Sequence, residues 1–274
     1  MVRRTYESRL EKCENPLLKK LFKIIIEKKT NLCVAADVET IERLEKLLDC
    51  VAEHICILKI HADSFDVGRA ILFDMIKRFQ QKHNFLLFVD RKFHEGPNSI
   101  QMIYKRYAAY ADIVTIWPES DDDIMALETG AGNIDEPRGC FAVCETSFTK
   151  KLEKNTFLPS LVASVESFVR NFQMKRRLEV AERNSFCVGI IAQTLNVSDE
   201  DNMIKVSPGV HLNKSGDQYT QRWRDPKAVV ESGADVIVVG RGIVAEPEDK
   251  WAETAKLYKN ISYDAYLEAT TKTK

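Results

Sequence analysis

Hydrophobic positions along the chain alternate between short continuous apolar runs and longer stretches in which apolar residues recur at helical spacing. The short runs are typical of strands buried on both faces, and the stretches between them are typical of amphipathic helices. The expected strands are 32–36, 56–61, 85–90, 113–117, 140–145, 186–192, 203–207 and 235–240. The expected helices are 16–29, 38–51 with Thr40 near its start, 67–79, 100–110, one from Ser120 onward, 158–182, 226–232 and 250–259.

Eight apolar strands separated by helices predict a parallel (β/α)8 barrel, the TIM barrel, in the α/β class. A doubly wound open sheet is the alternative, but no glycine-rich loop follows the first strand, as a dinucleotide-binding fold would require. No linker interrupts the pattern over the 274 residues. We therefore predict one domain covering residues 1–274, with an N-terminal helical extension over about residues 1–29.

Composition and charge narrow the class of protein. The net charge of -1 provides no basic field for nucleic acid or anionic lipid, and no apolar run approaches the length of a membrane span. The first residues lack the apolar core of a signal peptide. The seven cysteines include no CxxC pair, so we expect reduced, buried thiols in a cytoplasmic protein and no zinc site.

The third expected strand ends in the most informative stretch of the chain. Asp90 and Lys92 are two residues apart, so they project from the same face, and Glu95 and a Gly96-Pro97 break follow. In a barrel this face opens into the mouth, where catalytic groups are usually assembled. A solvated ion pair at a strand end is the alternative interpretation.

The carboxyl ends of the other expected strands also carry charged or polar side chains. Buried charges at a concave site must be paired, and such pairs indicate a functional site. His61 shares a face with Lys59, and we interpret it as a supporting hydrogen-bonding or core residue. The residues at the strand ends are Asp37, Lys59, His61, Asp90, Lys92, Glu145, Ser147, Gln193, Pro208, Gly240 and Arg241.

The end of the last strand has the character of a phosphate site. Gly240-Arg241-Gly242 offers backbone N–H groups and a guanidinium where (β/α)8 barrels usually bind phosphate. The polar segment 213–224, which contains Gln221, fits a lid that closes over a ligand, and a merely mobile loop is the alternative.

These motifs, in this order and over nearly the whole chain, resemble the orotidine 5'-phosphate decarboxylase family. The eukaryotic branch is the more similar, in which this unit is often the C-terminal half of uridine monophosphate synthase. The motifs are Thr30-Asn-Leu-Cys-Val-Ala-Ala-Asp37, Leu58-Lys-Ile-His-Ala-Asp63, Asp90-Arg-Lys-Phe93, Gly189-Ile-Ile-Ala-Gln193, Ser207-Pro-Gly-Val210 and Val238-Val-Gly-Arg-Gly242.

The resemblance implies a decarboxylation at C6 of orotidine 5'-monophosphate that gives uridine 5'-monophosphate without cofactor or metal. It implies that Lys92 protonates C6 and that Asp90 lies beside the substrate carboxylate. Lys59 and Asp37 would hold the ribose hydroxyls, and together with Asp90 and Lys92 they would form a charged network.

The remaining implied roles concern substrate binding and assembly. Ser147 would contact the pyrimidine, while Gln221, Gly240 and Arg241 would bind the phosphate, and Pro208 is counted among the substrate-binding residues. The family completes its active site across a homodimer interface, so Glu95 and Ser99 would serve the neighbouring subunit. A fused or associated orotate phosphoribosyltransferase is a further implied partner.

The chain departs from the family pattern at several positions, so nucleotide binding is a firmer expectation than full catalytic speed. A catalytically impaired homologue that binds pyrimidine nucleotides is therefore the second hypothesis. The departures are Glu95 and Ser99 for aspartate and threonine, Gly96-Pro97 for isoleucine-glycine, Trp223 for a phosphate-contacting tyrosine, His211 for a small residue, and the changed loop 148–151.

Two further hypotheses remain open. A metal-dependent phosphosugar decarboxylase or lyase would share the pattern at strand three, but it needs a carboxylate from strand two, where this chain has Lys59. A scaffold without any ligand would leave the charged residues at the strand ends unexplained.

Overall fold

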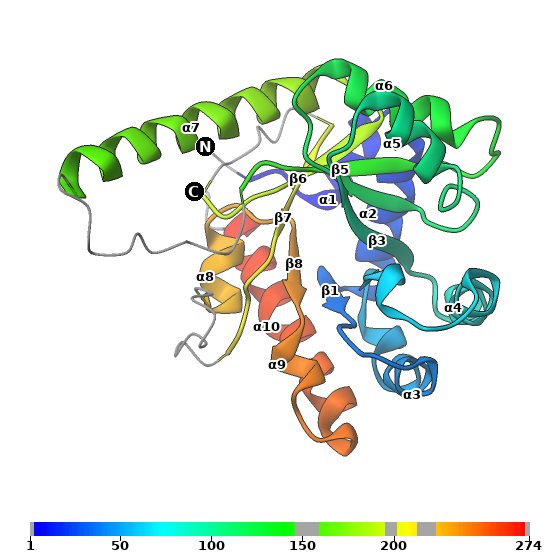
Figure 1. Ribbon diagram of the computed structural model, residues 1–274. Helices are drawn as coiled ribbons and strands as arrows, with labels where there is room; N and C mark the ends of the chain where they lie inside the picture. Colours follow the sequence, from blue (N-terminus) through cyan, green and yellow to red (C-terminus); the bar gives the residue numbers. More distant parts are fainter. Residues whose placement is uncertain (1–2, 146–158, 195–201, 213–222, 272–274) are drawn as a thin grey trace.

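The computed structural model describes residues 3–145, 159–194, 202–212 and 223–271, and its strands close into a parallel barrel in sequence order (Figure 1). The predicted (β/α)8 architecture is confirmed. Ser147, Gln221, and most of the expected lid lie outside the described residues. The strands are β1 Leu32–Ala35, β2 Ile57–Ile60, β3 Leu86–Phe93, β4 Ile113–Ile116, β5 Gly139–Val143, β6 Cys187–Ile191, β7 Ile204–Ser207 and β8 Val236–Val239.

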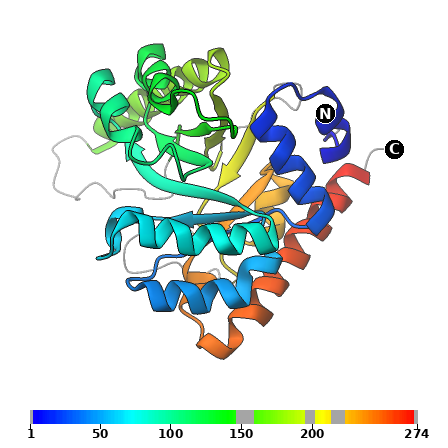
Figure 2. The same ribbon diagram turned by 90° about the vertical axis from the view of Figure 1, so that its right-hand side faces the viewer.

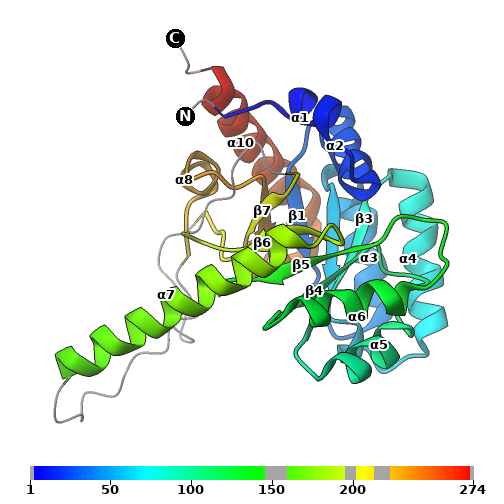
Figure 3. The same cartoon turned by 90° about the horizontal axis from the view of Figure 1, so that it is seen from above.

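Helices lie outside the barrel and cover its strands (Figures 1 and 3). They are α1 Tyr6–Lys12, α2 Pro16–Lys28, α3 Ile41–Val51, α4 Arg69–His83, α5 Pro97–Tyr104, α6 Asp121–Ala131, α7 Pro159–Arg183, α8 Pro226–Glu231, α9 Arg241–Val244 and α10 Trp251–Thr271. Short 3-10 turns are η1 Ala52–His54, η2 Ala62–Ser64 and η3 Glu248–Lys250. Within the described ranges, no helix combines the length and the apolar character needed to cross a bilayer.

The register of the first three strands brings their carboxyl ends together. Ala35 pairs with Lys59, and Lys59 pairs with Phe88 on the next strand. Asp37 comes two residues after Ala35, and Asp90 comes two residues after Phe88. Both carboxylates therefore stand at the height of Lys59 or just above it. The parallel register thus gathers charges that are far apart in the sequence.

Helix starts follow the expected capping chemistry. Thr40 accepts a hydrogen bond from the main-chain N–H of Arg43 at the start of α3, and Ser120 forms a capping box with Asp123 at the start of α6. Helix α5 begins at Pro97, earlier than expected from the apolar spacing, because proline suits the first position of a helix.

The expected N-terminal extension consists of α1 and α2, and α1 lies beside the C-terminal helix α10 (Figures 2 and 3). The ring of Tyr6 stacks on that of Tyr266 at 4.0 Å between centroids, and Tyr6 donates its hydroxyl hydrogen to the Asp235 carbonyl at 2.7 Å. The first and last helices therefore close the amino-terminal end of the barrel together.

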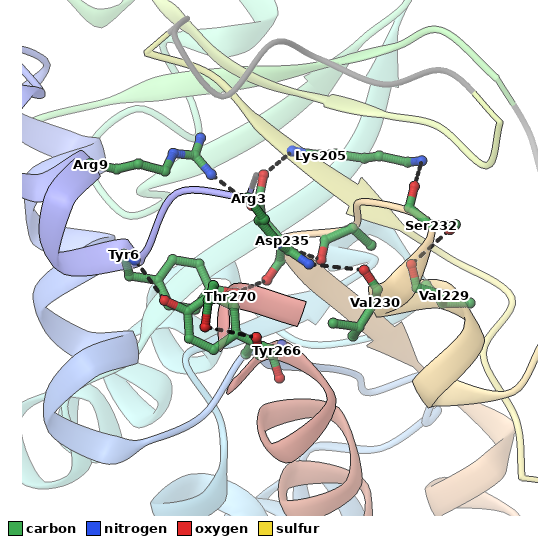
Figure 4. Close-up of polar contacts among 12 residues, drawn as sticks. Arg3, Tyr6, Arg9, Lys205, Val229, Val230, Ser232, Asp235, Tyr266 and Thr270 are labelled. Carbon is green, nitrogen blue, oxygen red and sulfur yellow. Dashed lines mark hydrogen bonds and ion pairs between the residues drawn. The ribbon is translucent and has the colours of Figure 1, made fainter. Parts of the chain in front are cut away.

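A buried carboxylate, Asp235, fixes this end of the barrel (Figure 4). It accepts hydrogen bonds from Arg9 at 2.7 Å, from Arg3 at 3.1 Å, and from the main-chain N–H of Lys205 at 2.8 Å. Burial opposes its charge, but the two arginines outweigh that effect and lower the pKa of Asp235. Its contacts link the N-terminal segment to β7 and β8.

Helix α7 extends well beyond the barrel in the views of Figures 1 and 3. Its C-terminal part packs against the barrel through buried Val180 and Ala181, whereas Phe168 and Phe172 are exposed. Only part of this helix therefore contributes to the core.

Candidate active site

A cavity of about 540 Å³ opens at the carboxyl ends of the strands. Apolar side chains from several strands form part of its wall, and charged side chains gather at β1, β2 and β3. Such a largely apolar cavity with a few converging polar groups is the usual form of a small-molecule site. Lining residues that the sequence predicted are Asp37, Lys59, Asp90, Lys92, Pro208, Gly240 and Arg241, together with His61 and Glu145.

Asp90 is the centre of the charged group. Its Oδ2 lies 2.8 Å from Nζ of Lys92 and 3.3 Å from Nζ of Lys59, and its Oδ1 accepts a hydrogen bond from Thr115 at 2.8 Å. Burial opposes the negative charge, but Lys59 and Lys92 outweigh it and lower the pKa of Asp90 to about 2. Asp90 is therefore ionised at neutral pH.

Lys92 reaches the cavity through an unusual backbone conformation. Its φ of 55° lies in the left-handed region, and the register between β3 and β4 shifts between Val89 and Phe93. The main-chain N–H of Lys92 donates to Oγ1 of Thr115 at 2.8 Å. This irregularity aims the amine at Asp90 while leaving the side chain 44% exposed, so a ligand can reach it.

Lys59 lies between two carboxylates and an imidazole. Its Nζ is 3.3 Å from Oδ1 of Asp37, 3.3 Å from Oδ2 of Asp90 and 2.9 Å from Nε2 of His61. Asp37 is half exposed, whereas the other carboxylate is nearly buried. Asp37 is consequently the acceptor that a ligand can most easily replace.

The neighbouring part of the wall, after β7 and β8, has the features expected of an anion site, and β8 pairs directly with β1. Arg241 lies over the ring of Trp223, with 5.5 Å from its guanidinium carbon to the ring centroid, and the rings of His211 and Trp223 stack at 4.2 Å. A Cβ at Gly240 would make a tight contact of 3.2 Å with Asp37 Oδ2, so the end of β8 lies directly beside Asp37. The planar stack supports the guanidinium from one side.

Three predicted residues are described but do not line this cavity. Glu95 accepts hydrogen bonds from Arg91 at 2.8 Å and from the main-chain N–H of His94 at 3.0 Å. Ser99 is exposed in the first turn of α5. Gln193 at the end of β6 is buried and is also absent from the lining.

Sequence reasoning missed Thr115, which holds both Asp90 and the backbone of Lys92. Thr115 is a short polar side chain inside the otherwise apolar strand β4, and that exception was the available signal. The apolar part of the wall was also missed, because strand runs do not reveal which members face inward. Its residues are Ala35, Phe88, Val143, Ile191, Val210 and Val238.

The described side chains suit organic-anion chemistry. Two lysines and two carboxylates alternate in contact, and Arg241 lines the same cavity at the end of β8. No group of three or more His, Cys, Asp or Glu residues that could hold a metal ion occurs within the described part of the chain. Fold and site together define a (β/α)8-barrel protein with a lysine–aspartate centre at the ends of β1 to β3 and an arginine at the end of β8.

Comparison with known proteins gives the family. Residues 30–257 match the model of the Orotidine 5'-phosphate decarboxylase / HUMPS family. An orotidine 5'-phosphate decarboxylase from Rhizopus oryzae is 34% identical, covering 96% of this chain and 95% of the relative, and one from Cyberlindnera jadinii is also 34% identical, covering 92% of each. The chain belongs to this family.

Solved structures agree with the fold. Orotidine 5'-phosphate decarboxylase from Pyrococcus horikoshii matches with a TM-score of 0.58 and 22% identity, covering 86% of this chain and 99% of that one. The orotidine 5'-monophosphate decarboxylase from Methanocaldococcus jannaschii matches with a TM-score of 0.59 and 18% identity. At these identities the structures support the barrel architecture alone.

Proposed function

We propose that this chain decarboxylates orotidine 5'-monophosphate to uridine 5'-monophosphate. The observation that carries the proposal is the contact of Lys92 with ionised Asp90 at the end of β3, inside a cavity large enough for a nucleotide. The family and its curated decarboxylase relatives support the same reaction. The enzyme is a carboxy-lyase.

The chemistry follows from the charges at the end of β3. The bond between C6 and the carboxylate carbon breaks, carbon dioxide leaves, and the electron pair remains on C6. Lys92 donates a proton to that carbon, and Asp90 repels the substrate carboxylate while holding the ammonium in place. The balance requires no electron donor or acceptor.

The other site residues bind the substrate in this proposal. Asp37 and Lys59 hold the ribose hydroxyls, and Gly240 and Arg241 bind the phosphate at the end of β8. Pro208 lines the same cavity. Ser147 and Gln221, which lie outside the described residues, complete the set as contacts to the pyrimidine and the phosphate.

Release of carbon dioxide from purified protein tests the reaction directly. We expect turnover of orotidine 5'-monophosphate that persists with a chelator present, and none in the Lys92→Ala variant. Calorimetry with uridine 5'-monophosphate separates the hypotheses, because binding without turnover would indicate the catalytically impaired homologue. Nothing in the described charged group favours that alternative, and Lys59 on β2 opposes the metal-dependent phosphosugar lyase.

We also propose a homodimer with shared active sites. Glu95 and Ser99 lie outside their own cavity, and large apolar residues are exposed on the helices that flank β3, Ile71 on α4 and Met102 on α5. A second copy packed against these two helices would cover both side chains.

Subunit mixing tests the shared site. Lys92→Ala and Glu95→Ala variants should each be inactive, and an equal mixture should regain about a quarter of wild-type activity, because half of the dimers are hybrids with one intact site. A mixture as inactive as its components would contradict the arrangement. A mixture of two Lys92 variants, Lys92→Ala with Lys92→Met, is the matched control.

The cellular setting is a further proposal. All seven cysteines are free, and six are buried, which fits a reducing compartment such as the cytoplasm. Association with an orotate phosphoribosyltransferase is the remaining predicted partnership. Copurification of that activity with the tagged protein from its own cells would test the association.

A further inference from the structure

His61 lies just after β2, and its contacts determine which ring nitrogen carries hydrogen. Nδ1 is 2.8 Å from the main-chain carbonyl oxygen of Asp90, which can only accept, so Nδ1 must be protonated. Nε2 is 2.9 Å from Nζ of Lys59, an ammonium that can only donate. The ring is therefore neutral, with its lone pair on Nε2.

We propose that His61 is a positioning residue, which holds the ammonium of Lys59 as its third acceptor and ties that lysine to the backbone of Asp90. The inference rests on the proposed function. The three N–H groups of Lys59 face Asp37, Asp90 and His61, and the contact with the imidazole is the shortest of the three. Losing it leaves Lys59 to two longer ion pairs.

The same geometry makes the charged group sensitive to acid. The charged groups that face the ring are Lys59 on β2, Asp37 after β1, and Asp90 and Lys92 on β3. The carboxylate oxygens are 3.8 Å and 3.6 Å from Nε2 and favour a second proton, but burial and Lys59 outweigh them and lower the pKa of His61 below 6.5.

Protonation of Nε2 would place two donors against each other across 2.9 Å. The imidazolium and the ammonium would then have to move apart, and Lys59 would lose its third acceptor. The proposal thus assigns part of the acid limit of activity to a residue that touches no reacting atom.

Two variants separate this role from simple space filling. In His61→Gln the amide oxygen can accept from Lys59, whereas His61→Leu keeps bulk without an acceptor. We expect kcat/KM to fall about 10-fold to 100-fold in His61→Leu, the range for a lost hydrogen bond to a charged group, and only a few-fold in His61→Gln. A wild-type kcat/KM in His61→Leu, or a kcat/KM of His61→Gln as low as that of His61→Leu, would overturn the proposal.

The pH profile is the second measurement. Activity of the wild type should fall as pH drops through the lowered pKa of His61, and His61→Gln should lack this part of the acid limb. Ionisation of the substrate phosphate affects both pH profiles equally, because the wild type and His61→Gln use the same substrate. His83→Gln, at the end of α4 and outside the cavity, is the control that should keep the wild-type profile. An unchanged acid limb in His61→Gln would contradict the proposal.

Nitrogen NMR of the labelled protein gives a readout that does not depend on turnover. At pH 7 we expect one His61 ring with a protonated Nδ1 and an unprotonated Nε2, assigned by its loss in His61→Gln. An Nε2-protonated or doubly protonated ring would overturn the inference. Absence of carbon dioxide release by the wild type would instead refute the proposed function while leaving this spectrum interpretable.

Discussion

The two ends of the barrel each contain a largely buried carboxylate with a lowered pKa, and the two carboxylates are paired with different kinds of cation. Asp90, at the cavity, is paired with the amines of Lys59 and Lys92. Asp235, at the opposite end, is paired with the guanidinium groups of Arg3 and Arg9. Lys92 is 44% exposed, whereas the two arginines are 11% exposed or less.

The kind of cation at each end fits a reactive role for the cavity end and a stabilising role for the closed end. A lysine amine is a compact donor that can release a proton, whereas arginine stays charged and binds a carboxylate through a fixed, planar set of donors. The cavity end therefore keeps charges that a ligand can rearrange, and the closed end keeps charges that cannot move. Substitutions at the two ends should accordingly affect different measurements.

The largest effect is expected from Lys92→Ala. Removing the proton donor should lower kcat by about 10³-fold or more, towards the upper range for a lost general acid, because the amine that protonates C6 in this proposal is gone. The unfolding free energy should change by less than about 1 kcal/mol, since the side chain is half exposed. Steady-state kinetics and denaturant titration check both statements. Near-normal turnover would remove Lys92 from the mechanism.

Asp235→Asn should give the opposite pattern. It leaves Arg9, which is almost fully buried, without its carboxylate, so the unfolding free energy should fall by about 3–5 kcal/mol. Nucleotide affinity of the folded fraction should stay within a few-fold of the wild type. Chemical denaturation and calorimetry measure the two quantities. A stability loss under about 1 kcal/mol would show that the closed end depends on its packing instead.

Arg241→Ala should weaken nucleotide binding at the proposed phosphate site. We expect affinity for uridine 5'-monophosphate to weaken by about 2–4 kcal/mol, because a charged, two-pronged contact to the phosphate is lost. Arg241→Lys keeps the charge without that geometry and should recover only part of the loss. Uridine, which lacks phosphate, should bind all three proteins alike. Equal affinity of the nucleotide for all three would remove Arg241 from the phosphate site.

The smallest expected effect is the pH dependence of stability at Asp90. Its pKa falls from 3.8 to about 2 on folding, so its charged form contributes about 2 kcal/mol above pH 4. This contribution declines as pH falls from the unfolded pKa of 3.8 to the folded pKa of about 2, and about half should be lost by pH 3. The difference in unfolding free energy between the wild type and Asp90→Asn should therefore shrink by about half between pH 5 and pH 3. A constant difference would show that Asp90 is not held as a charged group.

Much of the fold could be predicted from the sequence because buried parallel strands appear as continuous apolar runs. All eight strands were located, and Thr40 and Ser120 mark helix starts that the structure confirms. The C-terminal helix was expected to end near residue 259, but α10 continues to Thr271. Buried Tyr263 and Tyr266 pack there against elements distant in sequence, which a local pattern does not show.

The site was predictable where charge breaks an apolar run, as at Lys59 and Asp90. Thr115 was not, because its role depends on the shift in register between β3 and β4, a property of two strands together. Glu95 and Ser99 were assigned from family resemblance, and a single subunit does not test that assignment. Their roles stay predictions until the mixed dimers are measured.

The left-handed backbone of Lys92 has a consequence for how this barrel can be improved. A side chain in that region costs about 1 kcal/mol or more, whereas glycine adopts it freely. Lys92→Gly would relieve this backbone strain, but it would remove both the proton donor and one of the two amines that pair with Asp90. Screening for durability in this molecule must include turnover at each round, because the strained position and the reactive position coincide.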